Sequence, residues 1–488
     1  MAARVVIHGH FYQPPREDPV TGLIEAQHSA APFHDWNERV HAECYLPNVA
    51  AHIVGPDGER TVNNLERISF NFGPTLMRWL EEVHPSTYEA ILEADRISTA
   101  RLGFGNAVAQ AYHHTILPLA SMRDVRTQVR WGLADFEYRF GRAAEGLWLP
   151  ETAVNDDVLA VLIEEGVGFT ILAPHQARSV NGDLLDPSRP YRYYHPDGSG
   201  RWVALCIYDG ERSRAIAFDN VTSSAERFLD HLMPEGIQHL PALGIATDGE
   251  TYGHHHKFAD ICLAYACFLE APRRDLELLN YPALLERHPT ELEARLAPGE
   301  GTSWSCEHGV GRWKEDCGCS TGGEAGWAED WNQAWRAPLR RALEVVQSAA
   351  DELFDRDGAR VLHDPWEARD RYVDVQLRAR SLDDFLAAEC SVPVTDEVRT
   401  RAAQLLDMQE NAMAMFTSCG WFFSDVGGIE TVQIMRYASR TLELMSELGV
   451  TGVEEGFIAV LEQAKSNDVD KGTAADIYTA QVRSTQRS

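Results

Sequence analysis

The most constraining feature of this sequence is a strand–helix–strand pattern between residues 145 and 174. Residues 145–150 (EGLWLP) and 168–174 (GFTILAP) are short apolar runs typical of buried strands, and residues 156–167 (DDVLAVLIEEGV) have the apolar spacing of a helix. Two strands joined by a helix at this spacing form a crossover connection, which requires parallel pairing. The pattern therefore predicts an α/β fold built on parallel strands.

Other apolar runs end abruptly in polar residues, as strands do when they reach a functional loop. These runs are RVVIH at residues 4–8, WVALCIYDG at 202–210 and ALGIATDGE at 242–250. Several strands that deliver polar residues at their carboxyl ends predict a β/α barrel, whose active site lies on that face.

The second half of the chain has a different character. A length of 488 residues exceeds the size at which one hydrophobic core stops growing, so we expect at least two domains. Strand signals fade after about residue 325, and helical patterns dominate through residues 331–356, 366–390, 395–416 and 429–465. We therefore expect a catalytic barrel with inserted loops over residues 1–325, a helical domain over 326–466 and a flexible tail over 467–488.

Charge and composition exclude some classes of partner. The net charge is −30, whereas a nucleic acid or an anionic membrane surface must be met by clustered Lys and Arg. A neutral sugar polymer is compatible with this charge, although the charge does not select it. No apolar run reaches the roughly 18–20 residues of a membrane helix, and the N-terminus has no apolar signal core. With nine scattered cysteines, we expect a cytoplasmic protein with reduced thiols; the sequence leaves its oligomeric state open.

Two carboxylates directly follow predicted strands, at Glu151 in LWLPE (147–151) and at Asp248 in TDGETYG (247–253). Carboxylates from two strand ends can flank a glycosidic bond, one as nucleophile and one as proton donor. Each has a plain structural alternative. Glu151 could favour the start of the following helix, and Asp248 with Gly249 could be only a turn.

Together with two further segments, these motifs resemble the ordered sequence regions of glycoside hydrolase family 57. HGHFYQPP (8–15) is similar to that family's His-Gln-Pro opening, and YHHTILPL (112–119) resembles its second region. LWLPE matches the third region, whose Glu is the nucleophile, and TDGETYG the fourth, whose Asp is the acid/base. The resemblance implies an incomplete (β/α)7 barrel followed by an α-helical bundle, and a retaining enzyme that acts on α-glucans through a glycosyl-enzyme intermediate, without a metal or other cofactor.

The same resemblance assigns roles to individual residues. It makes Glu151 the nucleophile and Asp248 the general acid/base. His10, His114 and Glu250 become substrate-subsite or pKa-tuning groups. The remaining residues that we expect to bind an oligo- or polysaccharide are His8, Gln13, Trp148, Tyr252, Trp304, His308 and Trp421.

The sequence also departs from the family pattern. Tyr12 stands where the family's opening has His, and in TSCGWFFSD (417–425) Gly420 precedes Trp421 where the family usually has Asp. The C-terminal half looks like a domain of unknown function that is attached to one subgroup of the family. The resemblance therefore predicts the reaction class and leaves open both the glycan and the choice between hydrolysis, transfer and branching.

Residues 303–319 (SWSCEHGVGRWKEDCGC) form the least ordinary segment. Cys306, His308, Cys317 and Cys319 offer four soft ligands, but their Cys-x-His and Cys-x-Cys spacings are tighter than the Cys-x2–4-Cys of a zinc finger. We favour a glycine-rich loop whose Trp304, His308, Arg312 and Trp313 face the substrate. A metal site and a plain structural loop are the alternatives.

Two rival functions stay open at this stage. His8 and His10 lie two apart on a predicted strand and point to the same face, so with an acidic residue they could form the centre of a metal-dependent carbohydrate hydrolase or deacetylase. A non-catalytic glycan-binding protein is the other. The presence of both Glu151 and Asp248 argues against it, because a degenerate site usually loses one of them.

Overall fold

The structure is a computed structural model that describes residues 2–56, 58–322 and 328–483. Its contacts divide the chain into two compact units. The first unit comprises Met1–Gln13, Glu25–Gln110 and Arg139–Pro298, and the second comprises Pro14–Ile24, Ala111–Tyr138 and Gly299–Ser488. The second unit thus includes two segments from the first third of the chain.

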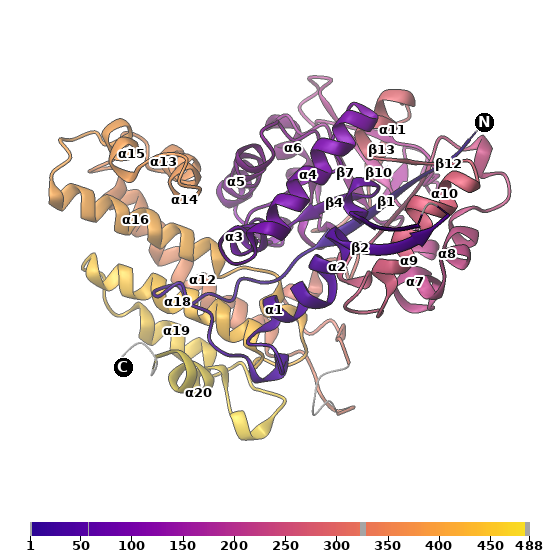
Figure 1. The fold of residues 1–488 in the computed structure, drawn as a ribbon. Coiled ribbons are helices and arrows are strands. Elements are labelled where there is room, and N and C mark those ends of the chain that lie inside the picture. Colours follow the sequence, from indigo (N-terminus) through magenta and orange to yellow (C-terminus); the bar gives the residue numbers. More distant parts are fainter. Residues whose placement is uncertain (1, 57, 323–327, 484–488) are drawn as a thin grey trace. The chain divides into compact units, whose positions relative to one another are not determined.

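The strand β1 (Ala3–Phe11) is the central element of the first unit (Figure 1). It pairs in parallel with β4 (Ser69–Phe72), β11 (Leu243–Asp248) and β12 (Leu276–Leu279). Nearly all of its residues are buried, as expected of a parallel strand that is covered on both faces. The strands predicted at residues 4–8 and 242–250 are therefore present.

Further parallel pairs extend this arrangement. β5 (Ala109–Gln110) pairs with β6 (Leu147–Trp148), and β7 (Phe169–Leu172) pairs with β10 (Trp202–Ile207). Single parallel bridges join Phe70 to Ala107 and Gly146 to Phe169. The second bridge connects the two strands around α6 (Asp156–Glu164), which confirms the predicted strand–helix–strand unit.

Three antiparallel pairs complete the strands of this unit, and none of the three was foreseen. They are β2 (Ala51–Gly55) with β3 (Gly58–Val62), β8 (Ala177–Ser179) with β13 (Ala294–Leu296), and β9 (Tyr191–Tyr194) with β10.

The helices of the first unit lie between these strands in the sequence. The predicted helix at 156–167 begins where the Asn155 side chain accepts a hydrogen bond from the Val158 amide, and it ends before Gly166, whose φ is 79°. The other helices are α1 (Trp36–Val40), α2 (Leu46–Val49), α3 (Pro74–Val83), α4 (Pro85–Leu102), α7 (Gly210–Phe218), α8 (Ala225–Leu232), α9 (Ala259–Tyr265), α10 (Ala271–Arg273) and α11 (Tyr281–Arg287).

The second unit is helical, as predicted for the C-terminal half. α12 packs against α19, and α16 packs against α18 (Figure 1). The predicted helix at 429–465 is in fact two helices, because Gly449 and Gly452 adopt left-handed φ angles of 92° and 88° between them. The helices are α5 (Met122–Phe140), α12 (Arg336–Leu353), α13 (Pro365–Arg371), α14 (Val373–Gln376), α15 (Leu382–Glu389), α16 (Asp396–Ala414), α17 (Cys419–Phe422), α18 (Ile429–Glu447), α19 (Val453–Leu461) and α20 (Ala474–Ile477).

The C-terminal segment, expected to be a flexible tail from residue 467, contains α20 and a following turn in which Tyr478 is buried. The Tyr478 hydroxyl lies 3.2 Å from Ser439 Oγ and 3.1 Å from Glu454 Oε1. Residues 484–488 of the expected tail lie outside the described residues. In the described part of the chain, no helix has the length and apolarity that crossing a bilayer requires.

Candidate active site

The carboxyl ends of three parallel strands bring several of the predicted residues together. His10 on β1 is in register with Asp248 of the neighbouring strand β11 on one side and with Asn71 of the neighbouring strand β4 on the other side. This follows from parallel pairing, which places equivalent strand ends at the same edge of a sheet. The edge therefore carries a carboxylate, an imidazole and an amide side by side.

Trp148 and the two histidines of β1 form a buried aromatic stack. The Trp148 ring lies 4.8 Å from the His8 ring and 4.9 Å from the His10 ring, with interplanar angles of 19° and 20°. Burial lowers the pKa of each histidine to about 3, so both are neutral at physiological pH. His8 and Trp148 are fully buried, and in this structure Trp148 packs against the ring of His10.

Asn71 fixes the orientation of both imidazole rings. Its Oδ1 lies 3.0 Å from His8 Nε2, and its Nδ2 lies 2.9 Å from His10 Nδ1. Assigned from this network, His8 donates from Nε2, while His10 accepts at Nδ1 and keeps its proton on Nε2. The remaining Asn71 proton is donated to Gln110 Oε1, at 2.6 Å.

Glu151 sits on a strained turn directly after β6. It is buried, and its φ and ψ of 56° and 21° lie in the left-handed region, as does the φ of 49° at Thr152. A non-glycine residue in this region costs on the order of 1–3 kcal/mol and persists only where the surroundings hold it. Such strain is common at active sites, where it aims a side chain that an ordinary turn would place elsewhere.

Gln176 supplies much of that support. Its Nε2 donates to the Thr152 carbonyl at 2.7 Å, and its Oε1 accepts from Thr152 Oγ1 and from the Ala173 amide, each at 2.8 Å. Gln176 is itself fully buried. One side chain thus ties the Glu151 turn to the segment that follows β7.

Asp248 ends β11 with part of its side chain exposed to solvent. Enough protein nevertheless surrounds the carboxyl that desolvation, together with the negative charge of Glu151, raises its pKa to about 7. A carboxyl with this pKa is partly protonated at neutral pH and is able to donate a proton. The charge of Asp248 in turn contributes to a raised pKa at the buried Tyr208 phenol.

Glu250 is two residues away and is held differently. Its Oε1 accepts hydrogen bonds from the Tyr45 hydroxyl at 2.6 Å and from the Tyr12 amide at 3.1 Å. Burial outweighs these donors and raises the pKa of Glu250 to about 8, with a smaller contribution from the charge of Asp248. Gly249 lies between the two acids because a Cβ at that position would overlap the Phe11 ring.

Gln13 and Tyr252, both predicted to bind substrate, lie around Glu250. The Gln13 side chain is half-buried and hydrogen-bonds to Tyr45. Tyr252 is fully buried, and its carbonyl accepts a hydrogen bond from Asn48 Nδ2 at 2.6 Å. Tyr252 therefore fixes the 249–252 turn from within the core.

The other predicted substrate-binding residues belong to the second unit. His114 is buried with a φ of 56°, and its Nδ1 lies 2.6 Å from Ser418 Oγ. Trp421 is buried and donates from Nε1 to the Arg336 carbonyl at 3.3 Å. Trp304 is half-buried and His308 is exposed.

Two residues expected to face the substrate are instead buried within the second unit. Trp313 donates from Nε1 to the Ser418 carbonyl at 3.1 Å, and Arg312 donates from Nη1 to the Phe422 carbonyl at 3.2 Å. A buried indole usually finds a hydrogen-bond partner for its N–H, as Trp313 does here. The loop at 303–319 thus attaches to the segment that carries Trp421.

Side-chain clusters suited to a metal ion do not include His8 or His10. Among the described residues, such clusters are formed by Cys306, His308, Cys317 and Cys319, and by Glu38, His41 and His84. The nitrogens of His8 face Ser69 and Asn71.

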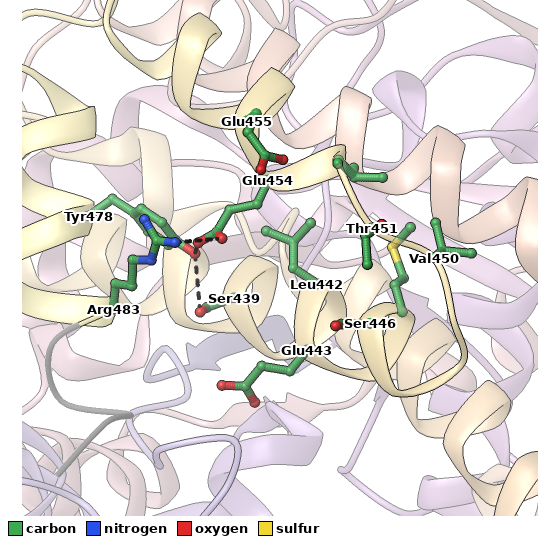
Figure 2. Close-up of a pocket in the computed structure, with 13 residues that line it drawn as sticks. Ser439, Leu442, Glu443, Ser446, Val450, Thr451, Glu454, Glu455, Tyr478 and Arg483 are labelled. Carbon is green, nitrogen blue, oxygen red and sulfur yellow. Dashed lines mark hydrogen bonds and ion pairs between the residues drawn. The ribbon is translucent and has the colours of Figure 1, made fainter.

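A pocket of about 370 Å³ lies in the second unit beside α18 and α19, and Figure 2 shows its lining. Glu454 on its wall is already paired with the Tyr478 hydroxyl and with Arg483, whose Nη2 lies 3.1 Å away. None of the predicted catalytic or substrate-binding residues is among its lining residues. We therefore do not assign the carbohydrate chemistry to this pocket.

Sequence reasoning missed the residues that orient the predicted ones. Asn71, Gln110, Tyr45 and Gln176 lie in segments without a recognisable motif, although Gln110 comes just before the YHHTILPL segment at residues 112–119. Tyr45 bonds to Glu250 205 positions away, Asn71 to Gln110 39 positions away and Gln176 to Thr152 24 positions away in the chain. The left-handed backbone at Glu151 gave no signal in the sequence either.

Comparison with known proteins identifies the family of this chain. The sequence profile of glycosyl hydrolase family 57 matches residues 24–288, and that of a domain of unknown function (DUF3536) matches residues 331–488. Among curated proteins, none matches.

Solved structures share the fold at low sequence identity. The exo-type maltose-forming amylase of Pyrococcus sp. ST04 is 15% identical with a TM-score of 0.69, over 94% of this chain and 83% of that one. The 4-alpha-glucanotransferase of Thermococcus litoralis is 14% identical with a TM-score of 0.55, over 92% of this chain and 60% of that one. The family 57-type branching enzyme of Pyrococcus horikoshii is 15% identical with a TM-score of 0.55, over 99% and 98% of the respective chains.

Proposed function

This chain belongs to glycosyl hydrolase family 57, and on that basis we propose that it is a retaining glycoside hydrolase or transglycosidase that acts on α-glucans. The amylase, glucanotransferase and branching enzyme that share its fold support this substrate class. The observation that carries the proposal is the acid pair: Glu151 lies on a strained turn, and its charge helps to raise the pKa of Asp248 to about 7.

The finer architecture is part of the same proposal. Parallel pairing runs from β11 through β1 and β4 to β5, β6, β7 and β10, with single bridges at two of the steps. The Asp209 amide, just after β10, donates to the Gly244 carbonyl of β11 at 2.8 Å. These contacts support an incomplete (β/α)7 barrel over residues 1–325, followed by the helical domain over 326–466.

In the first step, Glu151 attacks the anomeric carbon while Asp248 protonates the departing glycosidic oxygen. Asp248 suits this role because a carboxyl with a pKa near 7 is still partly protonated at neutral pH. A retaining mechanism requires two carboxyl groups about 5–5.5 Å apart. The negative charge of Glu151 contributes to the raised pKa of Asp248, so the two carboxyl groups interact electrostatically, as this mechanism needs.

In the second step, Asp248 acts as the base. It takes a proton from water or from a sugar hydroxyl, and the oxygen so activated displaces Glu151 from the anomeric carbon. Two inversions give net retention of configuration. The two carboxylates supply both the nucleophile and the proton transfer, so neither step requires a cofactor.

The neighbouring residues position this pair. His10 is in register with Asp248 in the sheet and Glu250 is two residues further along the chain, and we assign both to the sugar subsite. The Trp148 ring stacks against both His8 and His10 and so restricts the orientation of the His10 ring. Direct contacts of Gln13, Tyr252, His114, Trp304, His308 and Trp421 with the glycan stay predictions.

The test is a product profile with maltooligosaccharides and amylose for the wild type, Glu151→Ala and Asp248→Asn. We expect turnover by the wild type alone, with folding intact in all three by circular dichroism. Glu286→Ala and Asp230→Asn are matched controls, because both residues are acids of the first unit outside the site. Undiminished turnover in Glu151→Ala would overturn the site, and a wild type inert on every α-glucan would overturn the substrate class.

A further inference from the structure

Four soft ligand groups converge in the loop at residues 303–319 of the second unit. The sulfur atoms of Cys306, Cys317 and Cys319 and a ring nitrogen of His308 all lie within 4.8 Å of one another. Cys306 Sγ is 3.9 Å from Cys317 Sγ and 3.8 Å from Cys319 Sγ. Cys319 Sγ is 3.6 Å from His308 Nδ1.

These three separations match edges of a metal-centred tetrahedron, and the other pairs of ligand atoms lie within 4.8 Å. With zinc–sulfur bonds of about 2.3 Å and zinc–nitrogen bonds of about 2.0–2.1 Å, tetrahedral angles place two sulfurs about 3.8 Å apart and a sulfur and a nitrogen about 3.6 Å apart. A disulfide would instead bring two sulfurs to about 2.05 Å. All three cysteines are free thiols in the structure. The spacing therefore fits ligands around one small ion.

We propose that Cys306, His308, Cys317 and Cys319 bind one zinc ion in a closed structural site. Three thiolates and one imidazole are a soft, tetrahedral ligand set that suits zinc. All four positions are filled by the protein, which leaves none for a water or a substrate. The ion is therefore structural and separate from the carboxylate chemistry.

The surroundings of the cluster support thiolate ligands. The backbone amides of His308 and Arg312 hydrogen-bond to the Cys306 sulfur, and the amide of Glu307 to that of Cys319. Such amide donors orient and stabilise thiolate ligands of a metal. A zinc ion with three thiolates carries a net charge of −1, and the Arg336 guanidinium lies close by, donating to the Cys319 carbonyl at 2.8 Å.

The backbone is shaped to bring the two short motifs together. A Cβ at Gly311 would lie 3.1 Å from the Cys317 Cβ and 3.5 Å from the His308 Cβ, so glycine at this position lets the two arms of the loop approach this closely. This explains why Cys-x-His and Cys-x-Cys spacings, too tight for a zinc finger helix, still converge here.

An ion at this place would stabilise the segment that carries Trp421. Trp313 and Arg312, between the two ligand pairs, donate to the carbonyls of Ser418 and Phe422. Ser418 also contacts His114 Nδ1. Zinc would thus tie the loop to residues 417–422 and hold two of the predicted sugar-binding residues in place.

The test uses the full-length chain, purified under reducing conditions from zinc-supplemented cells. Elemental analysis should find about one zinc per chain, and X-ray absorption should show sulfur near 2.3 Å and nitrogen near 2.0–2.1 Å in a ratio of about three to one. Cys317→Ser and His308→Ala should lose the ion, whereas Cys419→Ser, a cysteine of the same unit outside the cluster, should keep it. Glu151→Ala should also keep it, which separates this proposal from the catalytic one.

A second readout does not depend on the folding of the variants. In the wild type, a strong chelator should expose Cys317 and Cys319 to alkylation, as mapped by mass spectrometry, and added zinc should protect them again. The proposal is overturned if the reduced wild type takes up no zinc, or if Cys317→Ser binds zinc as the wild type does. Alkylation that is unaffected by the chelator would also contradict it.

Discussion

Asp248 and Glu250 show how the environment of a single side chain sets its role. Asp248 ends β11 and Glu250 follows it, and burial raises the pKa of each, to about 7 and about 8 respectively. Asp248 keeps an exposed surface through which a proton can leave, whereas Glu250 is enclosed by Tyr45 and the Tyr12 amide. The first is therefore suited to proton transfer and the second to shaping the site.

The pH dependence of turnover should report Asp248. A general acid must be protonated, so activity should fall as pH rises through the Asp248 pKa of about 7. Asp248→Asn should lower kcat by roughly 10²–10⁴ and flatten this alkaline limb. The measurement is kcat against pH on maltooligosaccharides, with Asp230→Asn as the control. If the residual kcat of Asp248→Asn still falls with the same pKa on the alkaline side, the general acid is another group.

Glu250 should make folding stability depend on pH. Its pKa is about 8 in the folded protein and 4.5 when unperturbed, so the folded state binds the proton more tightly. This contribution is fully present below pH 4.5 and is lost as pH rises toward 8. Relative to Glu250→Gln, the wild type should become less stable across that window, by at most about 1.4 kcal/mol for each step of one in pH. Denaturant midpoints at several pH values measure this, and parallel curves for the two proteins would contradict it.

At the residue scale, the sequence could predict only the groups that carry a motif. Glu151, Asp248 and His10 stand at strand ends and are recognisable there. Asn71 and Gln176 are not, because their partners come from other strands and loops. A hydrogen bond between side chains of two different strands cannot be recognised from the residue spacing within either strand.

Among the elements, the turn that carries Glu151 is the least ordinary. The strand before it, β6, has only two residues, so the strand signal in EGLWLP overstates its length. The left-handed residues that follow are held by the side chain of Gln176 and by two backbone hydrogen bonds, from the Thr152 amide to the Leu149 carbonyl and from the Ala153 amide to the Pro150 carbonyl.

Gln176→Leu tests this support. It removes three hydrogen bonds around the turn, so we expect a loss of roughly 1–3 kcal/mol in the free energy of unfolding. We also expect a fall in kcat with little change in KM, since the Glu151 carboxylate would no longer be held in the orientation needed for attack. Gln238→Leu is the control, because Gln238 is exposed in the same unit. If Gln176→Leu alters stability but leaves kcat intact, the turn does not depend on this side chain for its geometry.

Most elements with a long, periodic pattern were predicted correctly, and several short ones were missed. The helices α12, α16 and α18 match predicted segments, as do the strands β1, β7, β10 and β11. The strands β4 and β12 have four residues each and were not predicted, whereas β7, which is equally short, was found through the strand–helix–strand pattern that contains it. The predicted helix at 366–390 is three short helices, because the chain breaks at Tyr372 and again over residues 377–381, where Arg378 has a φ of 58°.

For the whole molecule, the order of the four motifs along the chain predicted the family, which the amino-acid composition could not do. The family-57 match over residues 24–288 confirms the resemblance that four short segments suggested. The grouping of Pro14–Ile24 and Ala111–Tyr138 with the helical unit could not be foreseen, since it arises from tertiary contacts. The domain boundaries at residues 325 and 466 and the cytoplasmic location stay predictions.

The net charge of −30 leads to a prediction about binding. A neutral glucan releases no counterions on binding, so affinity for amylose should change little between low and physiological salt. A nucleic-acid-binding protein with several phosphate contacts loses about 10³–10⁵ in affinity between 50 and 200 mM salt. Affinity gel electrophoresis through amylose and through DNA at two salt concentrations measures both. Retention by DNA, or a steep salt dependence with amylose, would contradict the proposed substrate class.

The most direct test of the assigned carboxylates is azide rescue of Glu151→Ala with α-maltosyl fluoride. Fluoride leaves without a proton from Asp248, and azide can occupy the space of the missing carboxylate and attack the anomeric carbon from the same side as Glu151. The account predicts β-maltosyl azide, identified by the anomeric proton coupling in NMR. α-Maltosyl azide, or no azide product from a folded variant, would contradict Glu151 as the nucleophile.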